Sequence, residues 1–182
     1  VGMLTFGTAL PHLMRAIGAA LDWRLVILAS SLLALIAGVL VLRLGDGPHL
    51  PRSRPSALSL GAVLTAFRLP DFRASALGYF GHMWELYAFW TITPLLVKGA
   101  LQGTAFGDRA TVAFISFLVI GIGGLGCIAG GMASRRWGSA RVAALALAVS
   151  GTLCIIYPVV PGFGPALALG ALLIWGVAVI AD

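Results

Sequence analysis

The sequence predicts an all-α protein that crosses a membrane several times, and both its composition and its pattern of apolar runs indicate this class. Hydrophobic residues make up 60% of the 182 residues, whereas Asp, Glu, Lys and Arg together make up 10%. A soluble domain usually carries about 25% charged residues, so this chain has too few charges to solvate a globular surface. The mean hydropathy of +1.03 agrees with a surface that faces lipid.

Four apolar runs meet, or nearly meet, the length of about 20 residues that a helix needs to cross the hydrocarbon core. They cover residues 25–42, 72–97, 110–133 and 142–160. Two shorter runs, residues 1–14 and 165–181, lie at the two ends of the sequence. We therefore expect a polytopic membrane helix bundle with four whole spans and two partial ones, truncated at both ends.

Basic residues alternate along the connections between these runs. Residues 43–73 contain five Lys or Arg and residues 134–141 contain three, whereas the other connections contain two, two and none. The positive-inside rule places the two richer connections in the cytoplasm. Because the basic residues are spread between apolar runs, the pI near 10.4 does not indicate nucleic-acid binding.

The longest connection divides the chain into three parts. Residues 1–44 form the end of a first helix bundle, residues 45–72 a cytoplasmic central loop, and residues 73–182 the start of a second bundle. Within the loop, Leu60, Val63, Leu64 and Phe67 recur at helical spacing. They predict either a short amphipathic helix on the membrane surface or a plain linker.

Glu85 is the main functional candidate, because it lies near the centre of the run 72–97. A charge at the middle of a bilayer costs about 2.5–3.5 kcal/mol, so Glu85 must face the interior of a bundle or a wet cavity, or carry a proton. His82 lies three residues earlier on the same helical face. The pair could bind protons or a cationic substrate group, and the alternative is a structural hydrogen bond between helices.

Aromatic residues surround this pair in the sequence. Tyr79 and Trp84, together with Tyr87 and Trp90, could line a substrate path, or they could pack against neighbouring helices and lipid. Helical spacing does not decide between these alternatives.

The run 110–133 is rich in glycine, and Gly123, Gly126 and Gly130 lie on one side of it. Such small residues let two helix backbones approach closely. They allow helices to slide in a transporter or simply pack in a static bundle.

A hairpin follows the glycine-rich run and resembles a motif of the major facilitator superfamily, G-x-L-A-D-R-x-G-R-K/R. Gly131, Arg136 and Gly138 stand at its glycine, arginine and glycine positions. Arg135 stands where the family often has Asp, Ser139 and Ala140 replace the basic pair, and Arg141 follows. These departures resemble the degenerate copy of the motif between the eighth and ninth helices, so the chain would cover about helices 5 to 10.

The resemblance implies a secondary transporter in a bacterial inner membrane that moves a small solute by alternating access. The pair Glu85 and His82 within a span favours a proton gradient as its energy source. The expected partners are the lipid bilayer, a small-molecule substrate and protons, and we expect the full-length protein to be a monomer. Gly131, Arg135, Arg136, Gly138 and Arg141 would form its gating hairpin. Asp182 could be a second acid within the membrane or could lie at a helix end.

Two other classes of function stay open. A passive facilitator or a sensor could use the same helix bundle without proton coupling. A membrane-embedded enzyme would need a nucleophile with a base or a metal cluster, but the sequence has no G-x-S-x-G or H-E-x-x-H pattern. Cys127 and Cys154 lie inside apolar runs, without metal-ligand spacing. We therefore expect no enzyme, no metal and no cofactor.

Overall fold

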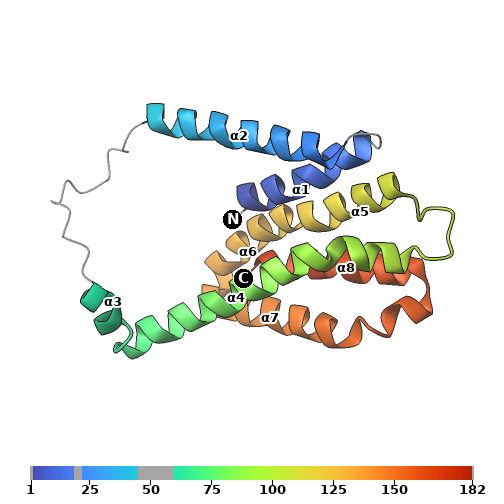
Figure 1. Cartoon of the computed structure of the whole chain (residues 1–182). Coiled ribbons are helices and arrows are strands. Elements are labelled where there is room, and N and C mark those ends of the chain that lie inside the picture. Colours follow the sequence, from blue (N-terminus) through green and yellow to red (C-terminus); the bar gives the residue numbers. More distant parts are fainter. Residues whose placement is uncertain (1, 19–21, 45–59, 182) are drawn as a thin grey trace. The chain divides into compact units, whose positions relative to one another are not determined.

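The computed structural model describes residues 2–18, 22–44 and 60–181, and every regular element in these ranges is a helix (Figure 1). The elements, in chain order, are α1 (Gly2–Ile17), α2 (Trp23–Leu44), α3 (Leu60–Ala66), α4 (Pro70–Ala100), α5 (Arg109–Gly121), α6 (Gly123–Trp137), α7 (Ser139–Ile156), the short 3₁₀ helix η1 (Val160–Phe163) and α8 (Pro165–Ala181). This agrees with the predicted all-α class.

Three helical segments in the described ranges are long and apolar enough to cross a membrane. They are Trp23–Leu44, Arg109–Trp137 and Ser139–Ile156. The first two contain the predicted runs 25–42 and 110–133, and the third ends four residues before the predicted run 142–160 does. The chain is therefore a helical protein with the features of a membrane protein.

Two further long helices, α4 and α8, do not meet these criteria of length and composition. α4 has 31 residues and contains the predicted run 72–97, but its polar and aromatic side chains make it less apolar than the three segments above. α8 is apolar throughout but has only 17 residues.

The chain forms two compact units, which are considered separately. The first contains residues 1–27 and 85–182, and the second contains residues 28–84. In the second unit, α3 is a helix of seven residues within the predicted amphipathic stretch, and the rings of Phe67 and Phe72 meet edge to face at 5.2 Å. Most of the predicted central loop, residues 45–59, lies outside the described residues.

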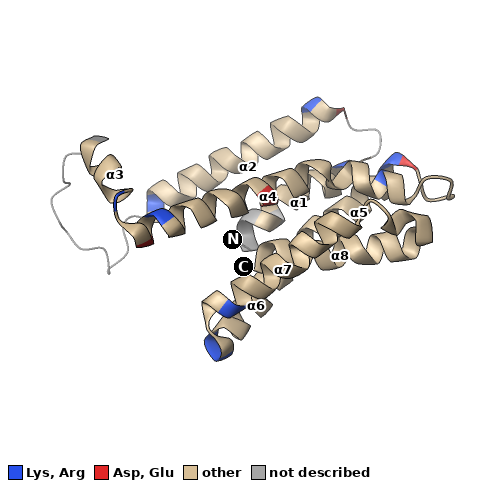
Figure 2. Cartoon of the chain, turned by 90° about the horizontal axis from the view of Figure 1, so that it is seen from below, with Lys and Arg blue, Asp and Glu red and all other residues tan. Residues whose placement is uncertain are grey.

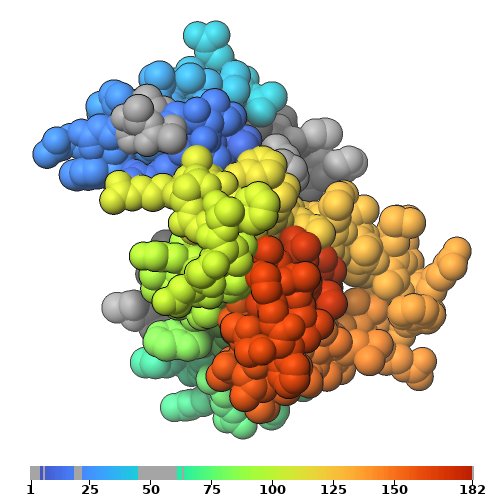
Figure 3. Space-filling model, turned by 90° about the vertical axis from the view of Figure 1, so that its right-hand side faces the viewer, coloured from blue at the N-terminus to red at the C-terminus, as the bar shows by residue number. Residues whose placement is uncertain are grey.

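In the first unit, α1 packs against α5 and α6, while α6, α7 and α8 pack against one another. At the end seen in Figure 3, the residues after α4 (yellow-green) lie beside η1 and the start of α8 (orange-red). Many large apolar side chains point outward, including Leu125, Ile128 and Ile155, which are 62%, 61% and 81% exposed. Such a surface is stable against lipid and would be costly in water.

Glycines bring α8 into backbone contact with its neighbours. A methyl group at Gly126 would lie 2.5 Å from the carbonyl oxygen of Val177, and one at Gly123 would lie 2.7 Å from that of Gly176. Methyl groups at Gly130 and Gly176 would overlap the carbonyl groups of Ala181 and Val119. The predicted glycine face of α6 therefore meets α8, and no larger residue fits there without moving a backbone.

Asp108 fixes the start of α5. Its carboxylate accepts hydrogen bonds from the backbone N–H groups of Ala110 (2.9 Å) and Thr111 (3.0 Å) and from the Thr111 hydroxyl. These bonds satisfy donors that the first turn of a helix leaves free. The Thr111 hydroxyl, followed by the Thr111 N–H, lowers the pKa of Asp108 below its usual value.

Changing Gly126 to Ala should destabilise the α6–α8 contact by about 1–3 kcal/mol, because the new methyl group has no room. Gly131→Ala is the matched control on the same helix, since a methyl group there meets nothing within 4 Å. Thermal unfolding of the purified full-length protein in detergent measures both. Equal melting temperatures for the two variants would contradict the contact.

Asp108→Asn should lower the melting temperature at neutral pH, and its difference from the wild type should shrink in acid. The pKa of Asp108 is lower in the folded than in the unfolded protein, so its contribution is complete above the ordinary Asp pKa of about 3.9 and disappears as the pH falls through the folded-state pKa. Melting temperatures of both proteins between pH 7 and pH 3 test this. A difference that stays constant over that range would rule out the carboxylate as its source.

Candidate functional site

Glu85 lies in the middle of α4, fifteen residues from either end of the helix, and is half-buried. Its carboxyl group approaches the middle of α7. There Ser150, a buried residue, donates a hydrogen bond from its hydroxyl to Oε1 of Glu85. The predicted acid therefore has a partner 65 residues away in the sequence.

Trp175 of α8 completes this contact. Its indole Nε1–H donates a hydrogen bond of 3.0 Å to the Ser150 Oγ, and its side chain is buried. The Ser150 hydroxyl thus accepts a hydrogen bond from α8 and donates one to α4. We call Glu85, Ser150 and Trp175 the Glu85 cluster, because they connect three helices through the Ser150 hydroxyl.

Two aromatic rings hold the indole of Trp175 in place. The ring of Phe89, one turn after Glu85, lies 5.0 Å from it, and the ring of Tyr157 lies 5.9 Å from it. Phe89 and Tyr157 are 2% and 5% exposed. This packing limits the orientations of Trp175 and so keeps its N–H directed at Ser150.

The hydrogen bond from Ser150 helps to offset the cost of placing the Glu85 carboxyl group among apolar helices. A carboxylate in an apolar bundle without a cation beside it is costly unless donors satisfy it or a proton neutralises it. The Ser150 hydroxyl supplies one such donor, at Oε1 of Glu85.

His82, Tyr79 and Trp84 belong to the unit of residues 28–84 and are described with it. Tyr79 and Trp84 are 59% and 81% exposed, and the rings of Tyr79 and Phe80 are 6.3 Å apart. His82 is half-buried and lies one helical turn before Glu85 along α4. The high exposure of Tyr79 and Trp84 fits a cavity or a lipid surface equally well.

The predicted hairpin lies between α6 and α7. Gly138 ends α6 with φ of 84°, a conformation that favours glycine, and its N–H donates to the Ser134 carbonyl at 2.9 Å. Arg135, Arg136 and Arg141 on either side of it are exposed. The junction of α6 and α7 lies at the opposite end of the unit from the connection between α4 and α5 (Figure 2).

Ser150 and Trp175 were not among the predicted site residues. Each lies inside a long apolar run, where a single serine or tryptophan has many structural explanations. The available signal was that Ser150 is a polar residue in the middle of the run 142–160. Asp182, the other predicted acid, lies outside the described residues.

No group of three His, Cys, Asp or Glu side chains that could hold a metal ion occurs within residues 2–18, 22–44 and 60–181. Comparison of the chain with models of protein families, with curated proteins and with solved structures found no match. The resemblance to the major facilitator superfamily therefore stays a prediction based on the hairpin and the order of the spans.

Ser150→Ala should destabilise the protein by about 1–3 kcal/mol, because it leaves a partly buried carboxyl oxygen without its donor. Trp175→Phe, which keeps the ring and removes the N–H, should cost about 0.5–1.5 kcal/mol. Thermal unfolding in detergent at neutral pH measures both.

Thr152→Ala is the control for Ser150→Ala, because the exposed Thr152 hydroxyl bonds only to the Ala148 carbonyl of its own helix. It should change stability by less than about 0.5 kcal/mol. If Ser150→Ala were as mild as Thr152→Ala, the hydrogen bond to Glu85 would contribute nothing to the fold.

Proposed function

We propose that the protein is a secondary active transporter that moves a small solute by alternating access and uses Glu85 to bind the coupling proton. The observation that carries this proposal is a single carboxyl group in the middle of α4, hydrogen-bonded to Ser150 of α7. Acids in such positions are costly in a membrane and typically mark ion pathways and proton relays.

Proton binding at Glu85 would change the contact between α4 and α7. Trp175 donates to Ser150, so the Ser150 hydroxyl is oriented to donate in turn to a carboxylate oxygen. A proton on the carboxyl group makes Glu85 a weaker acceptor for the Ser150 hydroxyl, because a neutral acid accepts hydrogen bonds less strongly than a carboxylate. A ligand shifts a conformational equilibrium only by its different affinities for the two states, and this weakening of a hydrogen bond supplies such a difference.

The order of the helices and the hairpin at Gly138 support a further proposal, that the protein is a major facilitator superfamily transporter. In this proposal the arginine-rich junction of α6 and α7 faces the cytoplasm, following the positive-inside rule. The α4–α5 connection with Lys98, Asp108 and Arg109 then lies on the other side. The inner membrane of a bacterium is the corresponding location.

Glu85→Gln should abolish proton-driven uptake, because the amide keeps the shape and the hydrogen-bonding oxygen but cannot release a proton. The measurement is uptake of a panel of small organic solutes into vesicles containing the full-length protein, with and without an imposed pH gradient. Wild-type uptake should depend on the gradient, whereas the variant should show no response to it.

Asp71→Asn is the matched control, because Asp71 is an exposed acid in the first turn of the same helix. It should transport like the wild type. Gradient-independent uptake that is equal in the wild type and Glu85→Gln would identify a passive facilitator, and Glu85 would then be structural. An absence of uptake for any solute would favour a sensor.

A further inference from the structure

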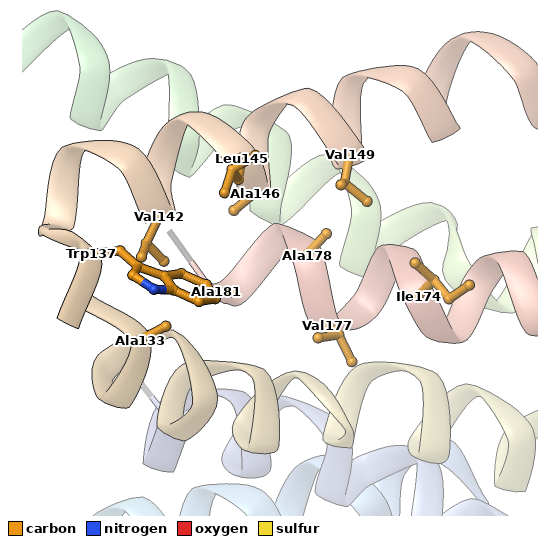
Figure 4. Close-up of a pocket in the computed structure, with 10 residues that line it drawn as sticks. All are labelled: Ala133, Trp137, Val142, Leu145, Ala146, Val149, Ile174, Val177, Ala178 and Ala181. Atoms are coloured by element: carbon orange, nitrogen blue, oxygen red, sulfur yellow. The ribbon is translucent and has the colours of Figure 1, made fainter. Parts of the chain in front are cut away.

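A groove between α6, α7 and α8 is lined only by apolar side chains (Figure 4). It has a volume of about 260 Å³, and all ten residues around it are Ala, Val, Leu, Ile or Trp. Trp137 lies at one end of the groove, and Val149 and Ile174 lie at the other. Ile174 and Val149 are 57% and 42% exposed, so the groove opens on the outer surface of the unit.

The groove is about two thirds as long as one leaflet of a bilayer is thick. Along α7 it runs from Val142 to Val149, a rise of about 10 Å. Half of a hydrocarbon core of about 30 Å is roughly 15 Å. The groove therefore starts at the helix ends, where a headgroup would lie, and reaches toward the middle of the membrane, as an acyl chain does.

Three arginines lie next to, or two residues from, lining residues at the Trp137 end of the groove in the sequence. Arg136 precedes Trp137 and Arg141 precedes Val142, which both line the groove, and Arg135 lies one residue further out. All three are exposed, and none has an ion pair or a side-chain hydrogen bond within the described part of the chain. Unpaired guanidinium groups at a membrane interface are suited to bind phosphate.

We propose that this groove binds one acyl chain of an anionic phospholipid, with the lipid phosphate held by Arg135, Arg136 and Arg141. The apolar lining selects a hydrocarbon chain, and the three positive charges at one end select a negative headgroup. Neither part alone specifies a ligand, but their junction at Trp137 and Val142 matches the junction of headgroup and chain. This site does not depend on the proposed transport activity.

Native mass spectrometry of the full-length protein, released from detergent with added phosphatidylglycerol or phosphatidylcholine, tests the site. The wild type should retain phosphatidylglycerol in preference to phosphatidylcholine. Replacing all three arginines with Gln should weaken phosphatidylglycerol binding by roughly 100-fold. Lys98→Gln with Arg109→Gln, at the opposite end of the unit, should leave it unchanged.

Val149→Trp tests the acyl-chain part separately and leaves the charge as it is. The larger side chain at this exposed position fills the groove and should weaken retention by about tenfold. Retention that is unaffected by this change would overturn the proposal, because only the headgroup would then be bound. Displacement of the lipid by inorganic phosphate would also overturn the proposal. So would equal retention of the two lipids, which is the result expected if another protein segment occupies the groove.

Discussion

The hydrogen bond from Ser150 to Glu85 is the constraint on which the described unit depends. A carboxyl group in the middle of an apolar helix has to find a donor, a cation or a proton, since lipid offers none of these. The Ser150 hydroxyl is such a donor, and α4 meets α7 at this residue. Trp175 then connects the same hydroxyl to α8, and a single polar contact determines how three helices are aligned.

Close packing makes this alignment specific. In lipid there is little hydrophobic drive for helices to associate, so contact between backbones and a few interhelical hydrogen bonds have to hold them. The glycines of α6 and Gly176 of α8 provide the backbone contacts, and the Glu85 cluster provides the interhelical hydrogen bonds. Gly176 directly follows Trp175, so the closest approach of α8 to its neighbours occurs beside its polar contact.

Sequence patterns were sufficient to predict the helical class and the approximate spans, because composition determines both. They also identified the unusual position of Glu85, because a charged residue in the middle of a bilayer has a high free-energy cost. They could not identify Ser150 or Trp175. Hydropathy does not show which face of the run 142–160 meets α4, and an indole serves equally well as an interfacial anchor and as a buried donor. The predicted run 110–133 lies within one continuous helical segment, Arg109–Trp137, in which only Ile122 separates α5 from α6.

The most direct test of this account is infrared difference spectroscopy of the full-length protein in lipid, with the pH stepped during the measurement. We predict a protonated-carboxyl band that changes with pH, is absent in Glu85→Gln and shifts in frequency in Ser150→Ala, because the hydroxyl bonds directly to the carboxyl. The absence of any band that depends on Glu85 would contradict a proton site built on this contact. A Glu85 band whose frequency is the same in Ser150→Ala would contradict it as well.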